Sequence, residues 1–190
     1  MPPHWNAYLS VASADQATSR AKELGAQVMN EPFDVMDVGR MAVLQDPTGA
    51  VFSVWEAKKH AGAGVLDEPG SLVWTELMTR DPGKARAFYT ALFGWGIQEM
   101  PMPAGTYTMF QRGDKSAGGM MQMPDQVPAQ VPAHWLSYFG VHDTDAMVAR
   151  AQGMGGKVMV PPQDIPNMGR FAVLADPQGA VFAIFAAARS

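Results

Sequence analysis

The segments HWNAYLSV (4–11) and HWLSYFGV (134–141) begin two copies of one pattern that lie 130 residues apart. The same offset relates the turn segments DPTGAVF (46–52) and DPQGAVF (176–182). Residues 2–60 align with the second copy without a gap, and about two positions in five are identical. Chance does not produce such a match, so it indicates the duplication of one supersecondary unit.

Each copy predicts a strand, a helix and three further strands. The opening segments 4–11 and 134–141 alternate in hydrophobicity as strands do. A short strand then leads into a Pro-containing loop, and the last two strands form a hairpin through a DPxG turn. The residues expected at the helix ends are Ser13 or Asp15 and Gly25 in the first copy, and Asp143 or Thr144 and Gly155 in the second.

The segment between the copies, residues 70–123, is a diverged version of the same unit. Residues 71–79 alternate as a strand, and Asp81 followed by Pro82 predicts the start of a helix. Strands are expected at 106–111 and 116–123. The expected helix carries an apolar stripe at helical spacing, formed by Ala85, Phe88, Tyr89 and Leu92.

The composition excludes several classes of protein. The chain is 47% hydrophobic with a net charge of −4, and its Lys and Arg residues do not cluster, so no nucleic-acid or membrane partner is expected. It has no apolar run of membrane-spanning length and no signal-peptide pattern, which predicts a cytoplasmic protein. The absence of cysteine excludes disulfides and thiolate metal sites.

Three groups of residues carry a resemblance to a known family. They are WTELMTRDPGKARAFYTALFGW (74–95), the Gly-Arg-Met/Phe-Ala-Val-Leu segments (39–44 and 169–174) and the two DPxGAVF hairpins. They resemble the vicinal oxygen chelate superfamily of glyoxalases, bleomycin resistance proteins and extradiol dioxygenases, and within it the tandem-module branch described as hydroxylases. The resemblance implies an α+β fold of repeated βαβββ units, with curled mixed sheets around a cavity and helices outside.

In that superfamily two βαβββ units form one module, and this chain is expected to hold three units. Residues 1–60 are predicted to be a lone unit, the second half of an incomplete module. A linker (61–69) follows. Residues 70–190 are predicted to be a complete module of two units (70–123 and 134–187).

A lone unit predicts self-association. It would leave apolar residues such as Leu9, Phe52, Val54 and Trp55 without cover. We therefore expect a homodimer in which residues 1–60 of two chains complete a shared module. The alternatives are that this unit packs on its own chain's module, with the dimer formed elsewhere, or that the chain is truncated and aggregates.

The positions that the resemblance assigns to metal ligands carry other residues here. The superfamily typically has His or Gln on the first strand of a unit and Glu on the last. The corresponding first-strand residues are Asn6, Trp74 and Leu136, and the last-strand residues include Ser53 and Ala183. Trp, Leu and Ala cannot bind a divalent cation, and Asn and Ser bind transition metals weakly. No metal and no other cofactor is therefore expected, the alternative being a displaced metal site at His134 and Glu76.

Glu76 is the charged residue that carries most information. It alternates with Trp74 and Met78 on the strand face that lines the cavity in this fold, so it is the candidate general base or ligand anchor. The structural alternative is a carboxylate paired with Arg170 or hydrogen-bonded to Tyr107 or Tyr138. The full set of predicted ligand-binding residues is Trp74, Glu76, Met78, Tyr107, His134, Leu136, Tyr138 and Phe185, with Glu76 also the catalytic candidate.

The function that follows is metal-free binding of a small organic ligand, a metabolite or a drug-like molecule. The alternative is a lyase, isomerase or dioxygenase-type enzyme that uses Glu76 as a base or the displaced metal site. A third possibility is an interaction role for a degenerate module. Arg40 and Arg170 recur after glycine in both copies, which favours a structural role that ties the hairpin to the helix over the binding of an anion.

Overall fold

The computed structural model describes residues 3–102 and 105–188. They divide into two compact units, each assembled from segments that are far apart in the sequence. Asn6–Gly62 and Glu76–Trp135 form what we call the α1–α2 unit. The described residues before Asn6, Ala63–Thr75, and the described residues from Leu136 onward form the α3 unit. No helix within the described ranges is long and apolar enough to cross a membrane.

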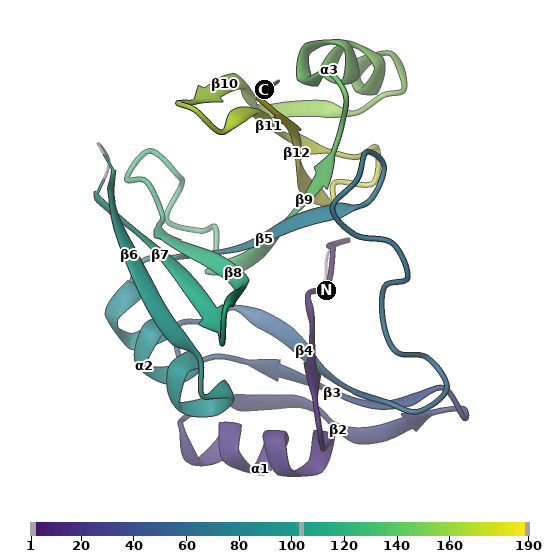
Figure 1. The fold of residues 1–190 in the computed structure, drawn as a ribbon, viewed down its shortest axis with the longest axis vertical. Helices are drawn as coiled ribbons and strands as arrows, with labels where there is room; N and C mark the ends of the chain where they lie inside the picture. The colour runs from purple at the N-terminus through teal and green to yellow at the C-terminus, as the bar shows by residue number, and fades with distance from the viewer. Residues whose placement is uncertain (1–2, 103–104, 189–190) are drawn as a thin grey trace. The chain divides into compact units, whose positions relative to one another are not determined.

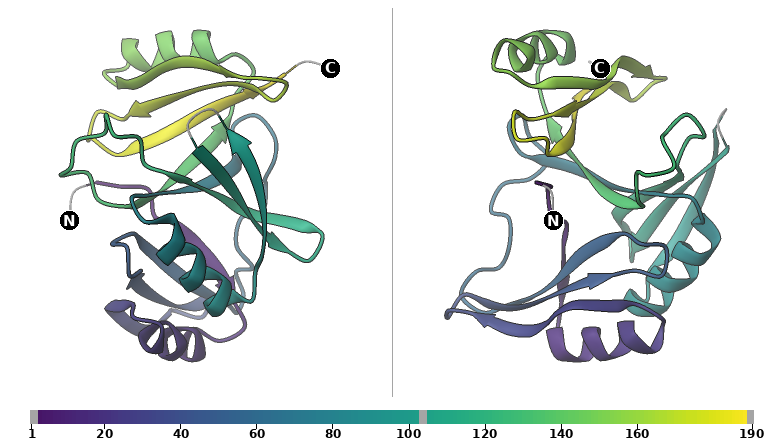
Figure 2. Two further views of the ribbon diagram at one scale, coloured as in Figure 1. Left: turned by 90° about the vertical axis from the view of Figure 1, so that its left-hand side faces the viewer. Right: turned by 180° about the vertical axis from the view of Figure 1, so that it is seen from behind.

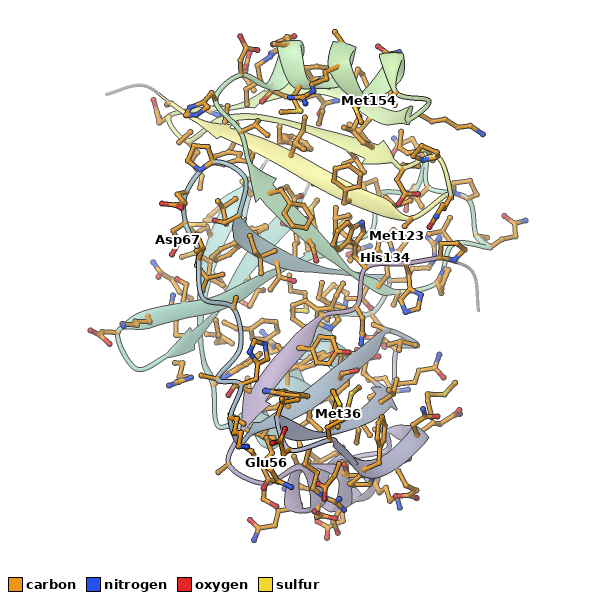
Figure 3. The ribbon with its side chains drawn as sticks, turned by 90° about the vertical axis from the view of Figure 1, so that its right-hand side faces the viewer. Met36, Glu56, Asp67, Met123, His134 and Met154 are labelled. Carbon is orange, nitrogen blue, oxygen red and sulfur yellow. The ribbon has the colours of Figure 1, made fainter. Side chains whose placement is uncertain are left out.

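The first repeat forms a small sheet with a helix on one face. Its elements are β1 (Tyr8–Val11), α1 (Ala14–Glu23), β2 (Gln27–Val35), β3 (Gly39–Gln45) and β4 (Val51–Ala57). The strand order is β1-β4-β3-β2, with β1 parallel to β4 and the other pairs antiparallel (Figure 1). Ser13 caps α1 by accepting the N–H of Gln16. The carboxylate of Glu56, a residue labelled in Figure 3, accepts the N–H of Ala14 at 2.8 Å.

The second repeat folds in the same way. Its elements are β9 (His134–Gly140), α3 (Thr144–Gly153), β10 (Lys157–Ile165), β11 (Gly169–Ala175) and β12 (Val181–Ala187), in the strand order β10-β11-β12-β9 (Figure 2). The strand registers agree. Tyr8 of β1 pairs with Ser53 of β4, and the residues 130 positions later, Tyr138 of β9 and Ala183 of β12, pair with each other in the same way. The duplication seen in the sequence is therefore a duplication of structure.

The middle segment is a third βαβββ pattern. It comprises β5 (Leu72–Thr79), α2 (Pro82–Phe93), β6 (Gly96–Met102), β7 (Gly105–Arg112) and β8 (Lys115–Gln122), in the order β5-β8-β7-β6, and β5 follows β9 in the strand order of the second sheet. The expected helix start is confirmed, because Asp81 accepts the N–H of Lys84 and Pro82 is the first helical residue. Gly94 ends α2 in the left-handed conformation, with φ of 66°.

Two expectations about strands were wrong, and proline is the reason for both. The short strands expected at 27–29 and 157–159 do not end in Pro-containing loops, because β2 and β10 continue through the prolines, and β6 was not expected at all. All three strands lie at the end of a sheet in the strand order. Proline lacks a backbone N–H but is tolerated on an edge strand or at a bulge. Pro32 and Pro162 both lie within register shifts of their strands.

Two mixed sheets and three helices in the described ranges confirm an α+β fold built from βαβββ units. A sheet curled around a cavity is not seen in the described part of the chain. The borders between the compact units fall inside β5 and inside β9, so these units cut across the expected segments 70–123 and 134–187. The division of the chain into a lone unit and a complete module stays a prediction.

The core of the α1–α2 unit joins the first repeat to α2. The Phe52 ring on β4 is fully buried, and its centroid lies 6.1 Å from that of Phe88, 5.6 Å from that of Tyr89 and 6.4 Å from that of Phe93. Leu9, Phe52, Val54 and Trp55 are all buried within this chain, so the expectation that they would lie open was wrong. Sequence reasoning missed this because nothing in the sequence indicates which sheet the apolar stripe of α2 covers.

One hydrogen-bonded chain of side chains crosses this core. The Tyr89 hydroxyl donates to Oδ2 of Asp46 at 2.8 Å and accepts from Nε1 of Trp135 at 2.9 Å. Oδ1 of Asp46 accepts the backbone N–H groups of Thr48 and Ala50, which holds the turn between β3 and β4. Burial, and then the charge of Asp46, raise the pKa of Tyr89 well above its usual range. Asp46, Tyr89 and Trp135 therefore satisfy one another inside the core.

The recurring arginines tie each hairpin to its helix. Nε and NH2 of Arg40 donate to the two carboxylate oxygens of Asp15 in the first turn of α1, at 2.7 and 2.9 Å. Arg170 does the same with Asp145 in α3, at 2.7 and 3.1 Å. The structural role expected from the recurrence is confirmed. These hydrogen bonds lower the pKa of Asp15 and of Asp145.

Replacing Tyr89 by Phe should lower the free energy of unfolding by about 1.5–3 kcal/mol. The substitution leaves the Asp46 carboxylate and the Trp135 N–H without their shared partner inside the core. Urea denaturation followed by far-UV circular dichroism measures the change. Tyr8→Phe is the matched control, because Tyr8 is 53% exposed and its hydroxyl donates to a weak acceptor, Sδ of Met41, at 3.9 Å. Equal losses in the two variants would contradict the role given to the Tyr89 chain.

Acid should destabilise the native chain more than the Arg40→Met and Arg170→Met variants. The folded-state pKa values of Asp15 and Asp145 lie below their unfolded values, so the unfolded chain takes up protons first as pH falls. The stability from these pairs is present above about pH 4 and is lost as pH falls through the lowered pKa values. Urea midpoints measured at a series of pH values between about 6 and 2 give the slope of stability against pH for each chain. Identical slopes in native and variant chains would refute the linkage.

Candidate functional site

The strand registers place three residues at one equivalent position of the three repeats. Tyr8 pairs with Ser53, Glu76 pairs with Gly119, and Tyr138 pairs with Ala183, each across the parallel pair of first and last strands. Glu76 therefore occupies a position that the other two repeats fill with tyrosine. Sequence comparison of the flanking repeats alone does not reveal this, because the middle repeat has diverged.

The metal-ligand positions do not fit a metal ion. In the first repeat, Nδ2 of Asn6 donates to Oγ of Ser53 at 2.7 Å, so the two polar side chains at these positions satisfy one another. In the second repeat the positions hold Leu136 and Ala183, which are hydrocarbon. Within residues 3–102 and 105–188, no group of three or more His, Cys, Asp or Glu side chains is arranged to hold a metal ion.

In the α1–α2 unit, Glu76 lies on the face of its strands that points away from α2. Its neighbour Leu77 belongs to the core beneath α2, together with Met120 and Phe110. Strand alternation puts Glu76 on the opposite face. Gly119 pairs with Glu76 on one side and with Met109 on the other, so Met109 lies in the same row across the sheet as Glu76. The residues that share this face are Glu76, Met78, Tyr107, Met109 and Met121. Glu76 is only 5% exposed, so a carboxylate lies buried on a face rich in methionine.

In the α3 unit, the predicted residues lie on an aromatic sheet face. Leu136 and Tyr138 alternate on β9, and the register continues the face to Phe185 on β12 and Phe171 on β11. The Tyr138 and Phe171 rings are 6.4 Å apart. A Cβ on Gly169 would lie 2.8 Å from the Phe185 ring, and the φ of this glycine is 152°. The Gly-Arg motif thus needs glycine for the close approach of the last strand's aromatic ring.

The structure separates the eight predicted ligand-binding residues into two groups of four. Glu76, Met78, Tyr107 and His134 belong to the α1–α2 unit, and Trp74, Leu136, Tyr138 and Phe185 belong to the α3 unit. Met78, Tyr107, Trp74 and Phe185 are half-buried, whereas Leu136 and Tyr138 are buried.

His134 and Arg170 are already engaged. Nδ1 of His134, which is labelled in Figure 3 and starts β9, lies 2.9 Å from the carbonyl oxygen of Pro132. The three guanidinium nitrogens of Arg170 donate to Asp145 and Asp164. The alternative in which Arg170 neutralises Glu76 is therefore not supported, and the partner of the buried carboxylate lies elsewhere.

Sequence reasoning missed a second concave feature. A hollow of about 390 Å³ in the α3 unit is lined mainly by apolar residues of α3, β9, β11 and β12, and also by Pro69, Gly70, Val141 and His142. None of the eight predicted residues lines it. The 130-residue offset between the two copies is the sequence signal that could have pointed to this hollow. It maps the lining residues Leu174, Phe182 and Ile184 to Leu44, Phe52 and Val54, which are fully buried in the first repeat.

Comparison with known proteins agrees with this architecture. Residues 71–184 match the family model described as the Glyoxalase/Bleomycin resistance protein/Dioxygenase superfamily. The chain belongs to this superfamily. It is 45% identical over 185 residues to the "Putative glyoxylase CFP32" of Mycobacterium tuberculosis, a match that covers 97% of this chain and 70% of that protein. It is 40% identical over 184 residues to the anthracycline biosynthesis protein DnrV of Streptomyces peucetius, covering 97% and 66% of the two chains.

Solved structures of superfamily members share the fold at low identity. The Mn(II)-bound glyoxalase from Novosphingobium aromaticivorans superposes with a TM-score of 0.63 at 16% identity, covering 94% of this chain and 61% of the other. The 2,2',3-trihydroxybiphenyl 1,2-dioxygenase from Sphingomonas wittichii strain RW1 gives a TM-score of 0.64 at 12% identity, covering 97% and 71%. At these identities the likeness concerns the fold alone.

We expect no stoichiometric binding of Mn²⁺, Ni²⁺, Fe²⁺ or Zn²⁺. The reason is the donor set at the ligand positions, where Trp74, Leu136 and Ala183 offer no ligand and Asn6 bonds to Ser53. Inductively coupled plasma mass spectrometry of protein purified without chelators, followed by calorimetric titration with each ion, measures the binding. About one metal ion per chain that is lost on Glu76→Gln would show that a displaced site exists.

Proposed function

We propose that this chain is a metal-free protein that binds a small organic molecule against the sheet face that carries Glu76. The observation behind the proposal is the buried carboxylate on a face formed largely by methionine, at a position that is tyrosine in the other two repeats. Methionine side chains adapt to irregular apolar ligands. One buried acceptor among them would fix the orientation of a ligand that carries a hydroxyl, amine or amide group.

The relatives are consistent with a small-molecule role. One is named for anthracycline biosynthesis and another as a glyoxylase, so relatives bear names of small-molecule chemistry. The resemblance to the tandem-module branch of the superfamily supports the same conclusion. An aromatic or polycyclic metabolite is the ligand class that such a face would suit best, since flat apolar surfaces pack well against thioethers and aromatic rings.

The enzymatic alternative uses the same residue. A carboxylate that is shielded from bulk water on an apolar face would serve as a general base that takes a proton from a carbon acid. Binding without turnover and binding with turnover differ in one measurable respect, the chemical identity of the ligand after incubation. Mass spectrometry of the recovered ligand therefore separates the two functions.

Native mass spectrometry of the purified chain after incubation with a bacterial metabolite extract should show a discrete ligand-bound species. Glu76→Gln should weaken binding of the recovered ligand by at least about ten-fold, as expected for the loss of a charge-assisted hydrogen bond. Glu68→Gln is the matched control, since Glu68 lies in an exposed segment. If Glu76→Gln unfolds the chain, Met78→Leu and Met109→Leu, which keep the apolar character of the face, test the site instead. A bound species unaffected by any of these changes would refute the location.

A further inference from the structure

The hollow in the α3 unit is the counterpart of a surface that is covered in the α1–α2 unit. In the α1–α2 unit, α2 covers Phe52 and leaves it fully buried. In the α3 unit the equivalent Phe182 is half-buried and lines the hollow, together with Phe139 on β9 and Met147 on α3. The two repeats thus present the same apolar face, and one of them is open.

The polar partners of that face are also repeated. Oδ1 of Asp176 accepts the N–H groups of Gln178 and Ala180 at 2.9 Å, as Oδ1 of Asp46 does for Thr48 and Ala50. Oδ2 of Asp46 accepts the Tyr89 hydroxyl. No side chain in the described part of the chain donates to Oδ2 of Asp176, which is half-buried where Asp46 is only 3% exposed.

A tryptophan completes the correspondence. The 130-residue offset relates Trp135, whose Nε1 donates to the Tyr89 hydroxyl, to Trp5. The Trp5 ring lies 4.9 Å from Phe139 and 6.1 Å from Phe182, at the open face, and Trp5 is 45% exposed where Trp135 is only 5% exposed. An indole donor and a carboxylate acceptor therefore accompany this face, as they accompany the face under Tyr89.

We propose that the open face of the α3 unit is a docking surface for an α-helix of the α2 type, contributed by a further βαβββ unit. Such a helix presents Phe-Tyr followed four residues later by Phe, as α2 does with Phe88, Tyr89 and Phe93. Its phenylalanines would fill the hollow. Its tyrosine hydroxyl would donate to Asp176 and accept from the Trp5 N–H. This inference does not depend on the ligand proposed above.

A peptide with the sequence of residues 80–95, RDPGKARAFYTALFGW, is the direct probe. A hydrocarbon staple between the positions of Ala87 and Ala91, which are exposed on α2, keeps it helical without altering the docking side. With a fluorescein label, it should bind the full chain saturably in a fluorescence anisotropy titration. Phe182→Ser should lower its affinity by at least about ten-fold. Met159→Ser on exposed β10 is the matched control and should have no effect.

The predicted tyrosine bridge gives a second, independent readout. Changing Tyr to Phe in the peptide, at the position of Tyr89, should weaken binding to the native chain by about ten-fold. The same change in the peptide should weaken binding to the Asp176→Asn variant much less, because that variant lacks the carboxylate oxygen that accepts the tyrosine hydroxyl. If Phe182→Ser does not fold by circular dichroism, Phe139→Ser takes its place.

Three results would overturn the proposal. One is a peptide that is helical by circular dichroism and does not bind. Another is binding that survives both Phe182→Ser and the tyrosine change. The third is a dimer, measured by light scattering against the 20.4 kDa monomer, that Phe182→Ser dissociates, because a second copy of this chain would then cover the face.

Discussion

The Tyr89 hydroxyl is the constraint around which the α1–α2 unit is built. A carboxylate and an indole N–H both lie in an apolar core, and each would cost free energy if it were buried without a partner. One hydroxyl satisfies both, since it donates to Asp46 and accepts from Trp135. The aromatic rings of α2 can then pack on Phe52 without leaving an unsatisfied polar group. Three stretches of the chain depend on this one contact.

The same construction explains why the two flanking repeats remained alike while their surroundings differ. The Asp-Pro turn, the buried last strand and the arginine that reaches the helix keep the same geometry in both copies. What differs is the cover of the helix-side face, closed by α2 in one repeat and open in the other. The two copies thus share the bonds inside the repeat and differ in what covers its helix-side face.

One row of positions that the fold defines carries altered residues in this chain. Where superfamily members typically carry metal ligands, this chain has an Asn6–Ser53 hydrogen bond, Leu136 with Ala183, and Trp74. These residues leave apolar surface and one buried acid along this row. Glu76 is that acid, and its burial sets it apart from the exposed carboxylates of the ion pairs.

The sequence by itself determined the repeat, the βαβββ order, the cap at Asp81, and the role of Arg40 and Arg170, and it left the cap of α3 open between Asp143 and Thr144, of which the structure has Asp143. These features depend on residues that are close in the chain or that recur at a fixed offset. It also determined which residues could not bind a metal. It did not predict β6 or the extended β2 and β10, because an edge strand tolerates proline for reasons of position in the sheet. Only the tertiary structure decided that α2 covers Phe52, that Arg170 is taken by Asp145, and that Phe182 lies open. Those outcomes depend on which distant segments meet, and hydrophobic patterns specify that a face must be buried without specifying its partner.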